Sequence, residues 1–276
     1  MINRKFHIRS DMEGVSGVVA MSQVTPGSPD YAEARSWYMA ELLALIEGLL
    51  EGGSSEVTVY DEHWFGRNVD VARIPRGVRV ICGKPPYQSK WAGGLDASHA
   101  GLILHGLHSM KGSGHTLCHT YEPDFNSIHL NGKPVGEIGL EAGVAGDFGV
   151  PLVLVIADSA GVAEARKLAP GVIGVATKIS RGCTGAECLS LADTTAAIRE
   201  AAARVAESPP RVKPLRLASP VEMDCSFQAG AFLEALRSRA KKHFVSADTL
   251  RLVGPTVTSV WARYWQLKLA TQSDLK

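Results

Sequence analysis

The sequence predicts an α/β fold in which helices flank a largely parallel sheet and a smaller α/β lobe follows at the carboxyl end. Short apolar runs alternate with longer segments whose apolar residues recur on a helical period, which is typical of a parallel sheet. Ser208-Pro209-Pro210 interrupts this alternation, and Pro214 and Pro220 extend the interruption. A chain of 276 residues is long enough for one large domain and a smaller lobe. We therefore place the first domain at residues 1–210 and the lobe at 211–276.

The first half of the chain alternates strands with one long helix. Phe6 and Ile8 fall on the same face of the first predicted strand, because side chains alternate along an extended chain. Apolar residues recur on one face of the long helix, which Gly52-Gly53 ends. The predicted elements are strands at Lys5–Arg9, Glu56–Tyr60, Val78–Ile81 and Leu102–Leu104, and a helix at Tyr31–Leu50.

A hairpin opens the second half of the chain. Asn131-Gly132 is a strong tight-turn signal, and it separates predicted strands at Ser127–Leu130 and Pro134-Val135. After it, the pattern predicts helices at about 136–147, Ala163–Leu168 and Thr194–Glu207, with strands at Leu152–Ile156 and Val172–Ala176. For the smaller lobe, the pattern predicts strands at Val221–Phe227 and Thr249–Val253 and helices at Ala231–Ala240 and Ser259–Thr271.

Charge and composition exclude several classes of partner. The formal net charge of +1 gives no broad basic surface for nucleic acid or an anionic membrane. No run approaches the roughly 20 apolar residues of a membrane span, and Met1–Arg9 enters a strand directly instead of an apolar signal core. Five cysteines, an odd number, argue against a disulfide framework and for a reducing compartment, so we expect a cytoplasmic protein.

Asp11 and Glu13 form the most informative pair in the sequence. They lie in Ser10-Asp11-Met12-Glu13-Gly14, which closes the first predicted strand. Residues i and i+2 of an extended chain point to the same side, so both carboxylates aim at one spot. Two like charges held so close repel each other unless a cation lies between them. The pair therefore predicts a metal site, although Asp11 taken alone also fits a turn or helix-cap residue.

Three more candidate ligands, His63, His108 and Glu137, follow predicted strands. In open α/β sheets, ligands bind beyond the carboxyl ends of the strands, so these side chains can converge with the first pair. Two imidazoles and three carboxylates suit zinc, with manganese and iron as alternatives, and five ligands suit two metals bridged by one carboxylate. Taken alone, His63 also fits a packed loop histidine, and Glu137 fits an acid at the positive end of a helix dipole. We interpret His105 as structural, because alternation points it away from the inward side.

Several blocks of the sequence occur together in one known family. Ser10–Gly14 has the form S-D-x-E-G, and the blocks that follow in order are Glu56–His63, Gly106–His108, Cys118-His119, Asn131–Leu140 and, more weakly, Ser180-Arg181 and Cys188–Ser190. These blocks resemble the M55 metallopeptidases, the D-aminopeptidase family first associated with dipeptide-transport operons.

The resemblance implies a dinuclear zinc site and a catalytic histidine. Two zinc ions per chain would be held by Asp11, Glu13, His63, His108 and Glu137, with Asp11 as the bridge. The family's catalytic histidine falls on His119, although His115 competes for that role on sequence alone. His119 suits general acid/base chemistry, because an imidazole titrates near neutral pH, and a nucleophilic role stays open.

The resemblance also implies an activity and an assembly. The implied activity is that of an aminopeptidase that removes the N-terminal residue of short peptides, with D-alanyl peptides as the substrates expected by analogy. The family forms a homo-decamer of two stacked pentameric rings around an internal chamber, which limits access to short peptides. Residues 1–210 would then be the metal-binding catalytic domain, and residues 211–276 would serve oligomerisation or pocket closure.

Two other functions stay open at this point. A dinuclear hydrolase of another amide, such as an L-peptide or an aminoacyl amide, would use the same ligands, as would a phosphoesterase. The sequence has neither a P-loop motif nor a basic clamp for phosphate, which argues against a phosphoesterase. A non-catalytic peptide-binding protein could carry structural metals, but His119, outside the ligand set, argues for catalysis. The loops at Trp64–Arg67 and Tyr121–Phe125 differ in character from typical family members, so the reaction class transfers more safely than the substrate.

Overall fold

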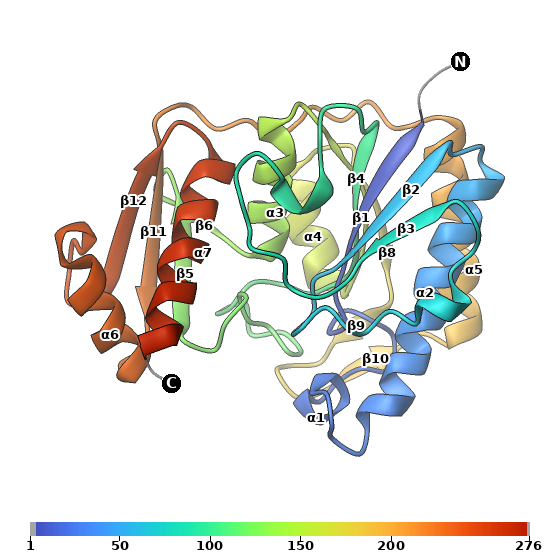
Figure 1. Cartoon of the computed structure of the whole chain (residues 1–276). Helices are drawn as coiled ribbons and strands as arrows, with labels where there is room; N and C mark the ends of the chain where they lie inside the picture. Colours follow the sequence, from blue (N-terminus) through green and yellow to red (C-terminus); the bar gives the residue numbers. More distant parts are fainter. Residues whose placement is uncertain (1–3, 275–276) are drawn as a thin grey trace.

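Six parallel strands form the main sheet, in the order β3-β2-β1-β4-β7-β8. The computed structural model describes residues 4–274, and Figure 1 shows this sheet between two layers of helices. Its strands are β1 (Lys5–Ser10), β2 (Glu56–Asp61), β3 (Val78–Ile81), β4 (Gly101–Leu107), β7 (Leu152–Ala157) and β8 (Ile173–Ala176). Parallel strands end at a common edge, so side chains that follow β1, β2 and β4 are brought together.

Helices cover both faces of the main sheet. They are α2 (Tyr31–Glu51) and α5 (Leu191–Glu207) on one face and α3 (Glu137–Asp147) and α4 (Ser159–Leu168) on the other. Side chains alternate between the two layers along a strand: on β4, Ile103 packs with α2 and α5, whereas Leu102 and Leu104 pack with α3 and α4. A strand buried on both faces explains why these segments are apolar almost throughout.

A second sheet stands beside the first and is antiparallel. Its order is β12-β11-β5-β6, with β5 (Phe125–Leu130), β6 (Lys133–Val135), β11 (Val221–Phe227) and β12 (Thr249–Gly254). Helix α7 (Val257–Asp274) lies between this sheet and α3, and α6 (Ala231–Ala240) lies at its outer end (Figure 1). Aromatic side chains fill this part of the core, among them Phe125, Phe227, Trp261 and Tyr264.

The remaining elements are short. They are the helix α1 (Met21–Val24), the antiparallel pair β9 (Lys178–Ser180) and β10 (Ala186–Cys188), and single 3-10 turns at Val71–Arg73, Ala92–Gly94 and Lys241–His243. Within residues 4–274, none of the helices has the length and apolar character that a membrane crossing requires.

The predicted α/β class is confirmed, and each predicted strand and helix is present. Helices α4 and α5 begin earlier than the apolar pattern predicts, because Asp158 and Ser190 cap them by accepting backbone N–H groups of Gly161 and Asp193. The predictions missed α1, β9 and β10. The boundary at residue 210 stays a prediction, and the antiparallel sheet crosses it, because β5 pairs with β11. Residues 1–3 of the predicted amino-terminal segment lie outside the described residues.

Candidate metal centre

The six predicted site residues meet at the carboxyl edge of the main sheet. They are supplied by the segments after β1, β2 and β4 and by the first turn of α3: Asp11, Glu13, His63, His108, His119 and Glu137. The five predicted ligands are each no more than 8% exposed. Strand ends far apart in sequence thus bring three carboxylates and three imidazoles into one buried cluster.

Asp11 lies at the middle of the cluster. Its Oδ1 is 2.8 Å from Nδ1 of His63, and its Oδ2 is 3.5 Å from Nε2 of His108. Beside His63, Glu13 Oε2 lies 3.2 Å from His63 Nδ1. Beside His108, Glu137 Oε1 lies 3.3 Å from His108 Nε2. One carboxylate therefore offers one oxygen to each of two neighbouring ligand groups, as a bridge between two metal ions would.

The donor atoms fall into two groups that could each hold a metal ion. Asp11, Glu13 and His63 form one group, and His108, His119 and Glu137 form the other, with the ligand atoms of each group within 4.8 Å of one another. Oxygen and imidazole nitrogen are the ligands of catalytic zinc and of other first-row metals.

The histidines are oriented by their outer ring nitrogens. His63 Nε2 lies 2.6 Å from the carbonyl oxygen of Val24, and His108 Nδ1 lies 3.0 Å from that of Ser109. A nitrogen that donates to a carbonyl leaves its partner nitrogen, with its lone pair, facing the cluster. His108 Nε2 and Glu13 Oε2 are buried without a hydrogen-bond partner in the described part of the chain. One such buried, unpaired ligand atom lies in each group, which fits a metal ion at each.

The electrostatics of the cluster favour positive charge. Burial alone would lower the pKa of His63, yet the Glu13 and Asp11 carboxylates outweigh it and hold that pKa well above its usual value. Burial likewise opposes the charged form of Asp11, yet the adjacent imidazoles of His108 and His63 keep the pKa of Asp11 well below its usual value. Protons on the two imidazoles thus balance the carboxylates when no metal is bound, and a cation would replace those protons.

His119 lies at the open side of the cluster. Its side chain is 26% exposed, and its Nε2 is 3.8 Å from Glu137 Oε1 and 4.0 Å from Glu13 Oε1. Its Nδ1 is 2.9 Å from the carbonyl oxygen of Leu117, which leaves Nε2 as the nitrogen that faces the centre. The imidazole of His115, the competing candidate, takes part in none of the hydrogen bonds and ion pairs within residues 4–274, and only its backbone contacts Cys118.

Two glycines, Gly14 and Gly106, allow the backbones at the ends of β1 and β4 to lie in direct contact. The Asp11 N–H donates to the His105 carbonyl at 2.8 Å, and the Gly14 N–H donates to the Gly106 carbonyl at 2.7 Å. A Cβ at Gly106, whose φ is +68°, would lie 1.9 Å from the Asp11 carbonyl oxygen, and one at Gly14 would lie 1.8 Å from that of Leu107. Only glycine permits this contact, which sets Asp11 beside the residue that follows β4. His105 itself is buried, and its Nδ1 pairs with Ser10 Oγ at 2.8 Å.

Sequence reasoning missed the residues that support the cluster. Tyr121 donates its N–H to Glu137 Oε1 at 2.7 Å. Lys178, 1% exposed, donates to the Glu13, Val15 and Val18 carbonyls and so anchors the loop that carries the first two ligands. Nothing in the residues around Lys178 distinguishes it from a surface lysine, because Thr177, Ser180 and Arg181 flank it, and a backbone N–H carries no sequence signal at all.

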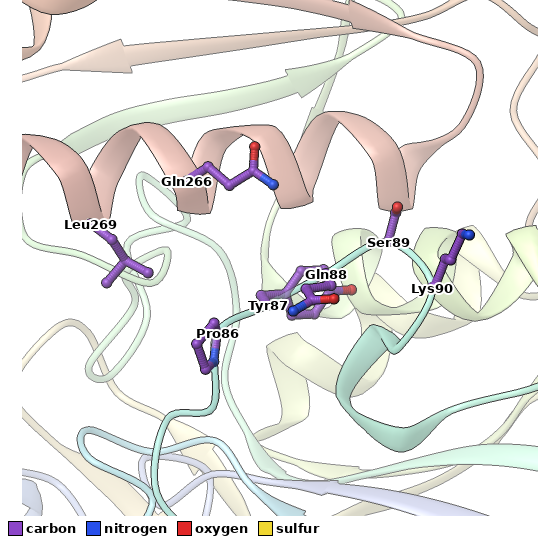
Figure 2. Close-up of a pocket in the computed structure, with 7 residues that line it drawn as sticks. All are labelled: Pro86, Tyr87, Gln88, Ser89, Lys90, Gln266 and Leu269. Carbon is purple, nitrogen blue, oxygen red and sulfur yellow. The ribbon is translucent and has the colours of Figure 1, made fainter.

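A separate pocket of about 350 Å³ lies between loop 86–90 and α7 (Figure 2). Its lining comprises Pro86, Tyr87, Gln88, Ser89, Lys90, Gln266 and Leu269, and it contains none of the six site residues. The chemistry of the chain therefore centres on the buried cluster and not on this surface pocket.

The fold and the paired ligand groups at the edge of its sheet define a metal-dependent hydrolase. Residues 5–265 match the profile of the peptidase family M55, described as D-aminopeptidase, and the chain belongs to this family. A D-aminopeptidase of Bacillus subtilis (strain 168) is 30% identical over 212 residues, which cover 76% of this chain and 77% of that protein. The solved structure of the Zn-dependent D-aminopeptidase DppA from Bacillus subtilis, described as a self-compartmentalizing protease, is also similar. Its TM-score is 0.88 at 25% identity, and the match covers 98% of this chain and 97% of that one.

Proposed function

We propose that this chain is a two-zinc aminopeptidase that removes the N-terminal residue of short peptides, with a preference for D-amino acids such as D-alanine. The observation that carries the proposal is the position of Asp11, whose two carboxylate oxygens face His63 and His108 separately. The family match and the Zn-dependent structural relative support zinc as the metal.

Each zinc ion would have its own ligands and share Asp11. Glu13 and His63 would complete one site, and His108 and Glu137 would complete the other. We assign His119 a separate role because it is the most exposed of the group, although its Nε2 lies near both glutamates. When bound, zinc supplies Lewis acidity, which polarises a peptide carbonyl and lowers the pKa of water towards about 7.

His119 would move protons at its Nε2 atom. The contact of Nδ1 with the Leu117 carbonyl favours the tautomer in which Nε2 is free to accept a proton. Nε2 would take a proton from the attacking water and deliver one to the departing amine, which is general acid/base catalysis. The Tyr121 N–H would keep the Glu137 carboxylate in place meanwhile.

The proposals for the substrate and for the assembly are based on the similar proteins. The D-aminopeptidase description of the family supports D-configured substrates, and the self-compartmentalizing neighbour supports a closed homo-oligomer. We propose a decamer of two pentameric rings whose chamber admits only short peptides. We also propose a cytoplasmic location, in keeping with the five cysteines, all of which are free thiols in the structure.

A dipeptide panel with metal analysis tests the proposal. The purified protein should contain about two zinc ions per chain and should cleave D-alanyl-D-alanine faster than L-alanyl-L-alanine. Chelation should abolish cleavage, and added zinc should restore it. Faster cleavage of L-dipeptides or aminoacyl amides would indicate another amidohydrolase, and zinc binding without any turnover would indicate a peptide-binding protein. Light scattering would test the decamer.

A further inference from the structure

We propose that Arg9 is the positioning residue of the metal centre, a buried guanidinium that ties together the segments carrying its ligands. This inference rests on the metal centre of the proposed function. Arg9 lies on β1, two residues before Asp11, and is 0% exposed. It is a charged residue in a strand whose neighbours Phe6 and Ile8 lie in the apolar core.

The guanidinium has partners on three other segments. Its Nη1 forms ion pairs with Glu62 Oε1, at 2.8 Å, and with Glu141 Oε2. Its Nη2 donates to the Ala92 carbonyl at 2.6 Å, and its plane lies over the ring of Tyr60, 5.6 Å from the centroid. The cation thus links β1 to the end of β2, to α3 and to loop 84–95.

Each acidic partner is next to a proposed ligand. Glu62 directly precedes His63, so its ion pair fixes the segment from which His63 extends. Glu141 lies one helical turn after Glu137, on the same face of α3. Arg9 itself is covalently close to Asp11. One guanidinium therefore contacts the neighbours of ligands from both metal sites.

Tyr121 extends the network to the loop of His119. Its hydroxyl donates to Glu141 Oε1 at 2.6 Å, and its N–H donates to Glu137 Oε1 at 2.7 Å. Tyr121 has a φ of +54°, a left-handed conformation that costs about 1–2 kcal/mol in a residue other than glycine. Contacts at both its backbone and its side chain hold this conformation, and strain of this kind gathers at functional sites.

Arginine suits this position. The Glu62 and Glu141 carboxylates would repel each other without a cation between them, and the planar guanidinium presents its N–H groups to two carboxylates and a carbonyl in fixed directions, which the point charge of a lysine does not. A buried pair often adds little net stability over apolar residues, because both charges lose their hydration. Its presence beside the ligands is therefore better explained by the positions that it imposes.

Metal affinity separates a positioning role from a merely structural one. The test compares the full-length wild type with Arg9→Lys, with Arg9→Met, and with the triple variant Arg9→Met, Glu62→Gln, Glu141→Gln. The triple variant removes the cation and both charges, so no unpaired charge stays buried, and its metal-free thermal unfolding temperature should approach that of the wild type. Zinc dissociation constants come from chelator competition, and the visible spectrum of the cobalt(II) form reports ligand geometry.

We expect zinc to bind about 10–100-fold more weakly to Arg9→Lys and to the triple variant, with an altered cobalt spectrum. The matched control is Arg251→Met, which also breaks ion pairs with two acids, Asp224 and Glu222, but in the antiparallel sheet; it should leave both readouts unchanged. Wild-type zinc affinity and cobalt spectrum in the folded triple variant would overturn the proposal. A wild type that binds zinc but cleaves no peptide would contradict the proposed function instead, while the affinity comparison would still decide the role of Arg9.

Discussion

The imidazole of His119 lies flat against that of His108, with ring centroids 4.0 Å apart and planes 10° from parallel. His108 is buried within the ligand cluster, whereas His119 reaches its open side. The stack therefore places a more accessible imidazole next to a proposed metal ligand, in a fixed orientation. His119 therefore adjoins the centre and is accessible from solvent at the same time.

The first prediction concerns this exposed imidazole. His119→Ala should lower kcat for a D-alanyl dipeptide by about 10²–10⁴-fold, because proton transfer contributes rate enhancements of that size. Zinc content should stay near two per chain, as elemental analysis would measure. His115→Ala is the matched control and should keep most of the activity. Loss of a zinc ion from the His119 variant would instead identify His119 as a ligand.

The second prediction concerns the bridge. Asp11→Ala should release both metal ions, because Asp11 faces both ligand groups, whereas His63→Ala should weaken mainly one site. Equilibrium dialysis against micromolar zinc, followed by metal analysis, distinguishes the two variants. One tightly bound zinc ion in Asp11→Ala would contradict the proposal that this carboxylate is a ligand of both metal ions.

The third prediction concerns the contact between β1 and β4. Gly106→Ala should unfold the protein or strongly destabilise it, because the new Cβ would lie 1.9 Å from the Asp11 carbonyl oxygen. Gly112→Ala is the matched control: its φ of +85° is similar to the +68° of Gly106, but no atom lies within 4 Å of its added Cβ. The control should cost about 1–2 kcal/mol, the penalty of the left-handed conformation alone. Equal unfolding free energies for the two variants would show that the contact is unimportant.

The fourth prediction concerns acid stability. Burial, with the charges of Arg9 and His99, holds the pKa of His7 well below its usual value of 6.5. Below pH 6.5, His7 takes up a proton in the unfolded chain but stays neutral in the folded protein. The contribution of His7 to the free energy of unfolding is therefore fully present above pH 6.5 and is lost as the pH falls. The slope contributed by this one group is about 1.4 kcal/mol per pH unit.

His7→Gln should therefore reduce the loss of unfolding free energy between pH 6.5 and 5, measured in urea with excess chelator to remove metal linkage. His129→Gln, at a partly exposed position on β5, serves as the control. Identical pH slopes for the wild type and His7→Gln would show that His7 takes up its proton in the folded state too.

The convergence of the proposed ligands could be predicted from the sequence, but the residues that support them could not. Asp11 and Glu13 share one side of an extended chain, and His63 and His108 follow recognisable strands, so local pattern and the strand-end rule predicted that these side chains meet. The contact of the Tyr121 N–H with Glu137 leaves no trace in residue type. The partners of Arg9 depend on which helix covers which face of the sheet. The pairing of β5 with β11 joins segments far apart in sequence. The Asn131-Gly132 turn signal predicts the hairpin itself but not the third strand that pairs with it.

The position of the β5–β6 hairpin also has a consequence for biosynthesis. A lone two-stranded hairpin is marginally stable in water, and this one gains its further neighbour only when Val221–Phe227 has been synthesised. Tyr121 precedes the hairpin and Glu137 follows it. A nascent chain that has not yet reached Val221–Phe227 therefore lacks the strand that flanks the hairpin between these two residues, and the antiparallel sheet forms only after β11 has been translated.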